Sequence, residues 1–204
     1  RMEVMHMGET VNAMLQGIMP AIIKGDTRGL EEIRRMDDKV DILHAGIIDY
    51  LGKISKQPLS EEQGRELMQL MEAVSNLENI GDIVETNLVV LGHDRVRDKI
   101  EVSEATQQVL YGFQQAITRS VEAAVQAVGQ RNERAGQVVI GMKEEINRIA
   151  DSAAAHEARR LIAEEPNRIP AYVLEVDLIE KQKRIYYFAK RMAKTVMPAV
   201  LQRG

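Results

Sequence analysis

Residues 3–26 have the sequence EVMHMGETVNAMLQGIMPAIIKGD, and this stretch sets the fold class. Its apolar side chains recur every three or four residues, which is the period of an amphipathic α-helix. They are Val11, Leu15, Ile18, Met19 and Ile22. Gly25 and Asp26 end the helix, and Pro20 is expected to interrupt its hydrogen bonds and bend it. Because the same period continues through nearly the whole chain, we predict an all-α protein.

Breaks rich in Gly, Pro, Asp and Asn divide the chain into six predicted helices. Ser60 and Gln63 form a capping-box pattern at the start of the third helix, while Ser103 and Asn132 are expected to cap the fourth and fifth. Long helices joined by short turns must run antiparallel to their neighbours. The predicted helices cover about residues 3–24, 28–56, 60–92, 103–129, 132–165 and 169–201.

The two halves of the chain match at a shift of 105 to 106 residues. At this shift Leu15 corresponds to Val121. Asp26, in the turn after the first predicted helix, corresponds to Asn132, in the turn after the fourth. Apolar positions agree while surface positions differ, which indicates an internal repeat. We therefore predict one domain over residues 1–204, built from two three-helix bundles. Its first repeat covers 1–92, a linker 93–102, and the second repeat 103–204.

Composition excludes several function classes. The chain has 204 residues, a formal charge of −4 and no cysteine. These values argue against nucleic-acid binding, disulfides and thiolate chemistry. No apolar run approaches the roughly 18 residues of a membrane span. The sequence begins with Arg1 rather than Met, and both a piece of a longer protein and a free-standing regulator are left open.

Four carboxylates form the main candidate site. Asp37 and Asp41 are four residues apart on the second predicted helix, as are Glu78 and Asp82 on the third. Each pair therefore shares a helix face, and their heights overlap when counted from the turn at Pro58. Such a cluster repels itself unless a hard cation neutralises it, and oxygen ligands suit Mg, Mn, Ca or Fe(III). The alternative is a solvated acidic stripe that binds no metal.

These carboxylates carry a family resemblance. The segments 37–43, DDKVDIL, and 77–82, LENIGD, resemble the two E(D)xxxD signatures of the PhoU family, whose members have two three-helix repeats. Residues 184–191, RIYYFAKR, are similar to the last helix of PhoU-like domains of bacterial sodium/phosphate cotransporters. The resemblance implies a metal of unknown identity (Fe, Mn, Mg, Ca or Zn) at Asp37, Asp41, Glu78 and Asp82.

The second repeat departs from this pattern. The positions equivalent to the four carboxylates hold Lys143, Asn147, Lys183 and Tyr187. Because a cationic lysine is no metal ligand in this setting, we expect the first repeat alone to bind a metal.

A ferritin-like di-iron protein is the main rival interpretation. Glu3-x-x-His6 and Asp41-x-x-His44 have the acid-x-x-His spacing of di-iron bundles. However, the second half supplies no matching motif. The other alternative is a helical interaction scaffold without metal.

The resemblance implies a regulatory domain of phosphate uptake and no enzyme, in agreement with the absence of catalytic motifs. It would act by protein contact on the membrane domain of a sodium/phosphate cotransporter, in the same or a separate chain. We expect it in the cytoplasm, at the inner face of the plasma membrane, and a homodimer is left open. Residues expected to contact the partner or anionic lipid are Lys183, Arg184, Tyr187, Lys190 and Arg191.

Overall fold

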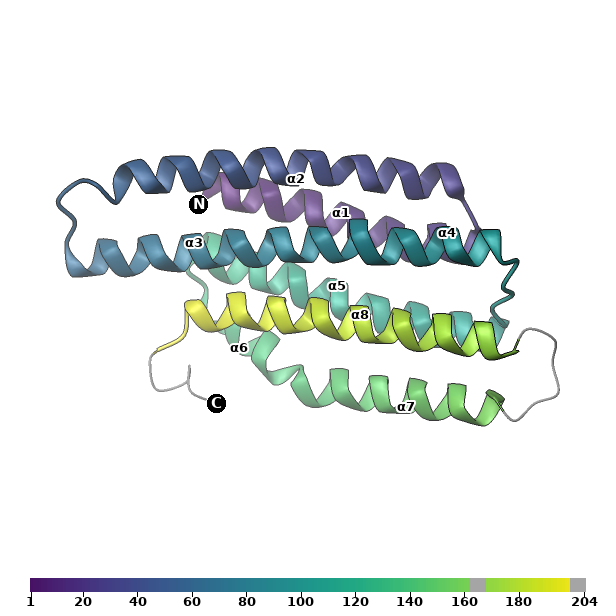
Figure 1. The fold of residues 1–204 in the computed structure, drawn as a ribbon. Coiled ribbons are helices and arrows are strands. Elements are labelled where there is room, and N and C mark those ends of the chain that lie inside the picture. Colours follow the sequence, from purple (N-terminus) through teal and green to yellow (C-terminus); the bar gives the residue numbers. More distant parts are fainter. Residues whose placement is uncertain (162–167, 199–204) are drawn as a thin grey trace.

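The computed structural model describes residues 1–161 and 168–198, and within these ranges the chain is all-helical without strands. It forms six long rods that lie side by side (Figure 1). The first three rods are α1 (Met2–Lys24), α2 (Thr27–Ile54) and a continuous rod of α3 (Glu61–Asp82), the π-helical η1 (Ile83–Leu88) and α4 (Val89–Arg97). The other three are α5 (Glu104–Gln130), α6 (Glu133–Gly141) followed by α7 (Lys143–Leu161), and α8 (Arg168–Thr195).

The core joins the two halves through α1 and α5. The predicted apolar face of α1 is fully buried, and α1 packs against both α2 and α5. Gly8 permits this close approach, because a Cβ at this position would lie 2.6 Å from the side chain of Val125. The aliphatic contact between helices from different halves makes one continuous core.

The turns after α1 and α5 have the same geometry. Gly25 and Arg131 both adopt a left-handed backbone, with φ of 67° and 52°. The side chain of Asp26 then accepts a hydrogen bond from the Gly29 amide, and Asn132 accepts one from the Ala135 amide. These paired N-caps support the repeat hypothesis, because each pair is separated by 106 residues.

The other predicted helix starts are confirmed. Ser60 and Gln63 make both hydrogen bonds of a capping box at the start of α3. The Ser103 side chain accepts a hydrogen bond from the Thr106 amide at the start of α5. Both helices therefore begin where the sequence predicted.

The prediction of a linker over residues 93–102 is partly wrong, because the third rod continues as a helix to Arg97. Gly92 packs so closely on α2 that an added Cβ would lie 2.8 Å from Leu30. On the helix surface of this segment, Arg97 pairs with Asp94 at 2.6 Å. Burial of one face thus extends the helix through a charged stretch.

The predicted fifth helix is interrupted at Met142, between α6 and α7. The Met142 amide donates to the carbonyls of both Val138 and Val139, which marks a tightened turn after the poor helix former Gly141. The Tyr186 hydroxyl donates to the Val139 carbonyl at 2.9 Å and attaches α6 to α8. The helix break at Met142 therefore lies close to a hydrogen bond that holds α6 against α8.

The ends of the last helices also differ from expectation. The helix of α8 ends at Thr195, since Pro198 disfavours helical backbone at the residue before it. The expected helical residues 162–165 and 199–201 lie outside the described residues. Among the described helices, none combines the length and the apolar character needed to cross a bilayer.

Candidate functional site: an acidic groove between α2 and the third rod

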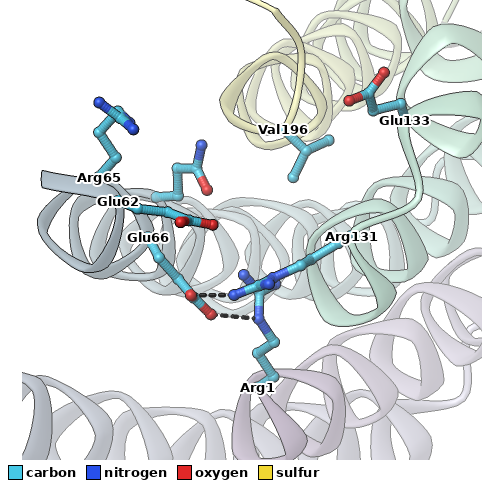
Figure 2. Close-up of a pocket in the computed structure, with 8 residues that line it drawn as sticks. Arg1, Glu62, Arg65, Glu66, Arg131, Glu133 and Val196 are labelled. Atoms are coloured by element: carbon cyan, nitrogen blue, oxygen red, sulfur yellow. Dashed lines mark hydrogen bonds and ion pairs between the residues drawn. The ribbon is translucent and has the colours of Figure 1, made fainter. Parts of the chain in front are cut away.

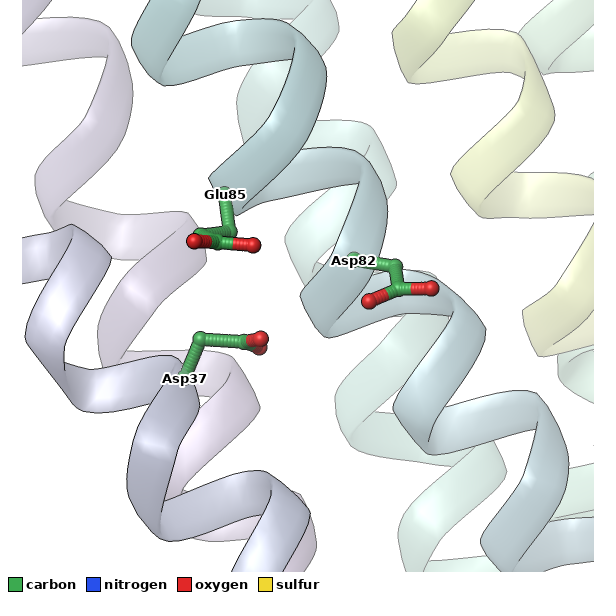
Figure 3. Close-up of side chains that lie close together, drawn as sticks. All are labelled: Asp37, Asp82 and Glu85. Carbon is green, nitrogen blue, oxygen red and sulfur yellow. The ribbon is translucent and has the colours of Figure 1, made fainter.

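Three carboxylates converge between α2 and the third rod. Asp37 projects from α2, Asp82 is the last residue of α3, and Glu85 lies in η1 (Figure 3). One oxygen atom from each side chain lies within 4.8 Å of the other two. The groove therefore presents three oxygen donors to one point in space, an arrangement that suits a hard cation.

The π-helical segment contributes directly to this arrangement. Glu85 follows Asp82 by three residues, so the two side chains share a face of the rod. Single π-helical turns inside α-helices are rare and occur frequently at functional sites. Here the π-helical turn begins at Ile83, immediately after Asp82, and carries Glu85 itself.

Asp37 is the buried member of the cluster. Asp37 is only 5% exposed, and its Oδ1 has no hydrogen-bond partner. Gly81 makes room for it, since a Cβ at residue 81 would lie 2.5 Å from that oxygen. A buried carboxylate oxygen without a partner is costly, so the donor set fits a bound cation.

The electrostatics of the groove agree with this geometry. Burial, together with the negative charges of Asp41, Glu85, Asp82 and Glu78, raises the pKa of Asp37 from 3.8 to about 7. A divalent cation would reverse this effect, because it favours the deprotonated carboxylate.

The four carboxylates predicted from sequence do not form one set. Asp37 and Asp82 belong to the group of three, whereas Asp41 is exposed and Glu78 half-buried, outside that group. Burial first, and then the charge of Asp82, raise the pKa of Glu78, while His44 lowers it. Asp41 and Glu78 therefore extend the acidic surface along the groove toward His44.

Sequence reasoning missed Glu85. The predicted pairs used a spacing of four residues, and Glu85 lies three residues after Asp82. That spacing also places two side chains on one helix face, so the signal was present. Arg34 of α2 lies 3.4 Å from Glu85 and marks the rim of the groove.

The di-iron arrangement is not observed. Glu3 and His6 are both exposed at the start of α1. Over residues 1–161 and 168–198, the only group of three potential ligands within 4.8 Å is the one around Asp37. The acid-x-x-His motifs therefore do not meet in a common centre.

The predicted contact residues lie on α8 and are mostly exposed. Lys183, Arg184, Tyr187 and Arg191 face solvent, and Lys190 is half-buried. The Arg191 guanidinium lies 6.0 Å from the centre of the Tyr187 ring and pairs with Glu72 of α3 at 3.2 Å. Of the three consecutive aromatic residues, Tyr186 and Phe188 belong to the core, so only Tyr187 is available to a partner.

A second hollow, of about 340 Å³, lies where the two halves meet (Figure 2). Glu66 of α3 accepts hydrogen bonds from both Arg1 and Arg131. The hydrogen bond from Arg131, followed by that from Arg1, lowers the pKa of Glu66. Because three arginines face three glutamates around this hollow, its charges are balanced, and we assign it to the junction of the halves.

Six helical rods, with an acidic groove on the first three, define the class of this protein as an all-helical bundle. Residues 4–87 match the model of the PhoU domain. This match covers 84 of the 204 residues, and the described residues have the PhoU fold.

Comparison with a solved structure extends the fold over nearly the whole chain. The crystal structure of PhoU from Pseudomonas aeruginosa superposes with a TM-score of 0.88, covering 96% of this chain and 92% of that one. The sequence identity is 17%, so this likeness concerns the fold alone.

Curated relatives match part of the chain. The chain is 31% identical over 83 residues to the "Putative inorganic phosphate export protein YjbB" of Escherichia coli strain K12, and 30% identical over 83 residues to the protein of the same name in Salmonella typhimurium. In both cases the match covers 41% of this chain and 15% of the relative, in the C-terminal region of YjbB.

Proposed function

We propose that this chain regulates phosphate transport by direct contact with the membrane domain of a phosphate transporter. The observation that carries the proposal is the match of residues 4–87 to the PhoU domain, combined with the similarity to the C-terminal region of a protein named for phosphate export. In this proposal the domain lies at the cytoplasmic face of the plasma membrane.

The kind of transporter is the finer part of the proposal. The sequence resemblance implied a sodium/phosphate cotransporter, whereas the name of YjbB refers to export. The shared element is a membrane domain that moves phosphate, in the same chain or in another. The test should therefore measure phosphate flux in both directions, in cells with and without this domain.

The exposed face of α8 is the proposed contact surface. Lys183, Arg184 and Tyr187 project from one stretch of helix, and cationic and aromatic side chains suit both a cytoplasmic loop and anionic lipid. We expect the paired substitutions Lys183→Glu and Arg184→Glu to reduce co-purification with the membrane domain. The pair Arg35→Glu and Lys39→Glu, on the exposed side of α2, is the control with the same change of charge.

We further propose that Asp37, Asp82 and Glu85 bind a hard cation, with Asp41 and Glu78 nearby. A bound cation would supply positive charge between α2 and the third rod. The carboxylates would then hold the two rods together instead of repelling one another. In this way metal binding would rigidify the surface that the first repeat offers to a partner.

Elemental analysis of the purified chain tests the metal proposal. Asp37→Asn and Glu85→Gln should each lose bound Mn, Fe or Mg, while Asp38→Asn, on the exposed side of the same helix, should retain it. Equal metal content in all four proteins after passage through chelator and reloading would overturn the site. Regulation by the metal-free scaffold would then be the remaining function.

A further inference from the structure

A third hollow, of about 510 Å³, lies along the seam between α1 and α5, where helices of the two halves pack together. It shares no lining residue with the 340 Å³ hollow or with the group of three carboxylates. Small-molecule sites have volumes of roughly 300–1,000 Å³ and combine an apolar lining with a few polar groups. This hollow has both kinds of lining. Its apolar part includes Met19, Pro20 and the ring of Tyr111, and its polar part includes Gln16 and Gln114.

The internal repeat explains why the seam is open at this place. At a shift of 106 residues, Gly8 corresponds to Gln114 and Met19 corresponds to Val125. On one side of the seam, Gly8 lets α1 approach α5 so closely that a Cβ at residue 8 would lie 2.6 Å from the Val125 side chain. On the equivalent side, Gln114 and Met19 line the hollow. Because a glutamine stands where the first half has glycine, the same close approach is prevented there.

Gln114 is the buried polar residue of the hollow, with an exposed fraction of 5%. Its Nε2 donates a hydrogen bond to the Leu15 carbonyl at 2.8 Å and lies 3.4 Å from the Thr118 hydroxyl oxygen. Since a carbonyl only accepts, this bond fixes which end of the amide is nitrogen. The amide oxygen, Oε1, is buried and has no hydrogen-bond partner among the described residues. Such an oxygen is costly to bury and calls for a donor.

The backbone of α1 supplies a second acceptor. Pro20 lies inside α1 and has no N–H, so it cannot donate to the carbonyl of Gln16 four residues earlier. Gln16 and Pro20 both line the hollow. The interruption of the helix therefore adds a carbonyl without its usual donor to the amide oxygen of Gln114.

The charged residues of the hollow are balanced and engaged. Arg119 and Glu122 both line it and have opposite charges. Arg119 lies 3.5 Å from Glu145 of α7, and Glu122 accepts a hydrogen bond from Gln16 Nε2 at 3.4 Å. The hollow therefore offers no excess charge that would select an ion.

We propose that the hollow between α1 and α5 is a binding site for a small, uncharged aromatic molecule with an N–H or O–H group. The donor of the ligand satisfies Gln114 Oε1 and removes the cost of burying that oxygen unpaired. The ring packs on Met19, Pro20 and Tyr111, because methionine sulfur and aromatic side chains both attract an aromatic ring. A ligand in this place contacts both halves of the chain and strengthens their association.

Matched probes test the need for a donor. Indole and benzofuran have nearly the same shape, and of the two indole alone carries an N–H. Calorimetric titration of the full chain with each probe gives the two dissociation constants. We expect indole to bind about tenfold more tightly than benzofuran, as one hydrogen bond to a buried acceptor implies. Equal affinities, or no binding of indole, would overturn the proposal.

The variants Gln115→Trp and Gln126→Trp test the place of binding. Both glutamines are exposed on α5, but only Gln115 lines the hollow. A tryptophan ring at residue 115 fills the space, so we expect Gln115→Trp to weaken indole binding by about tenfold or more. Gln126→Trp should bind indole as the wild type does. Indole binding that Gln115→Trp leaves unchanged would refute the site.

The variant Gln114→Met tests the acceptor. Methionine has a similar length and no amide oxygen, so this variant should bind indole and benzofuran with about equal affinity. A retained preference for indole would overturn the role of Gln114. If the variant does not fold, because it also loses the bond to the Leu15 carbonyl, the comparison of Gln115→Trp with Gln126→Trp decides. None of these results bears on the proposed transporter contact, since that surface lies on α8.

Discussion

Asp37 is the residue at which burial and charge oppose each other most directly. Its carboxyl group is almost fully buried, lies beside other carboxylates, and has one oxygen without a hydrogen-bond partner. In the absence of a cation, protonation is the way this group avoids a buried negative charge. Its titration should therefore be visible in the stability of the whole domain.

We expect the metal-free protein to lose stability as pH rises from about 4 to about 7. The unfolded carboxyl releases its proton near 3.8, whereas the folded Asp37 retains it to about 7. Between these values the folded state binds more protons, so the free energy of unfolding falls with pH. The pKa of Glu78 is also raised and contributes with the same sign.

The Asp37→Asn variant isolates this effect. In chelator, and well above the folded pKa of about 7, it should exceed the wild type in unfolding free energy by on the order of 2 kcal/mol. Below the unfolded pKa the two proteins should be similar. Urea unfolding across this pH range is the measurement, and a parallel pH dependence in both proteins would contradict the assignment.

At the scale of the element, the acidic groove depends on the close approach of α2 to the third rod. Gly81 lies at this contact, directly against the Asp37 carboxylate. The following π-helical turn contributes Glu85 to the same groove. Two local features of one rod, a missing side chain and a widened turn, therefore make the site.

Substitution of glycine by alanine should have opposite effects on α2 and α3. Gly81→Ala should lower the unfolding free energy by about 1–3 kcal/mol, because its Cβ would lie 2.5 Å from Asp37 Oδ1. Gly46→Ala, where a Cβ meets nothing within 4 Å, should raise it by about 0.5–1 kcal/mol. Thermal and urea unfolding of both variants measure the difference. An equal gain in the two proteins would show that α2 and α3 are not in close contact at this level.

At the scale of the whole molecule, the two halves meet in an apolar core and in a charged junction. The core contact lies along α1 and α5, and the junction joins Glu66 of α3 to Arg131, at the turn between α5 and α6. The apolar contact supplies most of the association, since exposed ion pairs contribute little. The ion pairs of the junction are expected to add a small, salt-dependent contribution to the stability of the contact between the halves.

Glu66→Gln should lower the unfolding free energy by about 0.5–1 kcal/mol at low salt, and by less at high salt, because ions screen the junction. Glu61→Gln is the control, since Glu61 is 95% exposed and pairs with Arg65 of its own helix. It should change stability little under either condition. Salt-independent losses of equal size in both variants would argue against a role of the junction in joining the halves.

The sequence by itself determined the all-helical class, the number of rods and most of their ends. Periodic apolar residues, the Ser60 capping box and the Asn132 cap act within a few residues of themselves, so local pattern is sufficient to predict them. The sequence also placed Asp37 and Asp82 on facing helices. The repeat hypothesis gains support from the equal turns at Gly25 and Arg131.

Only the tertiary structure decided which carboxylates meet. Glu85 enters the group and Asp41 remains in solvent, because convergence of oxygen atoms depends on the rotation of each rod about its axis and on its distance from α2. Both quantities are set by side-chain packing between rods, such as Asp37 against Gly81. The break at Met142 and the helical course of residues 93–97 have the same origin, since contacts with α8 and α2 outweigh local preference there.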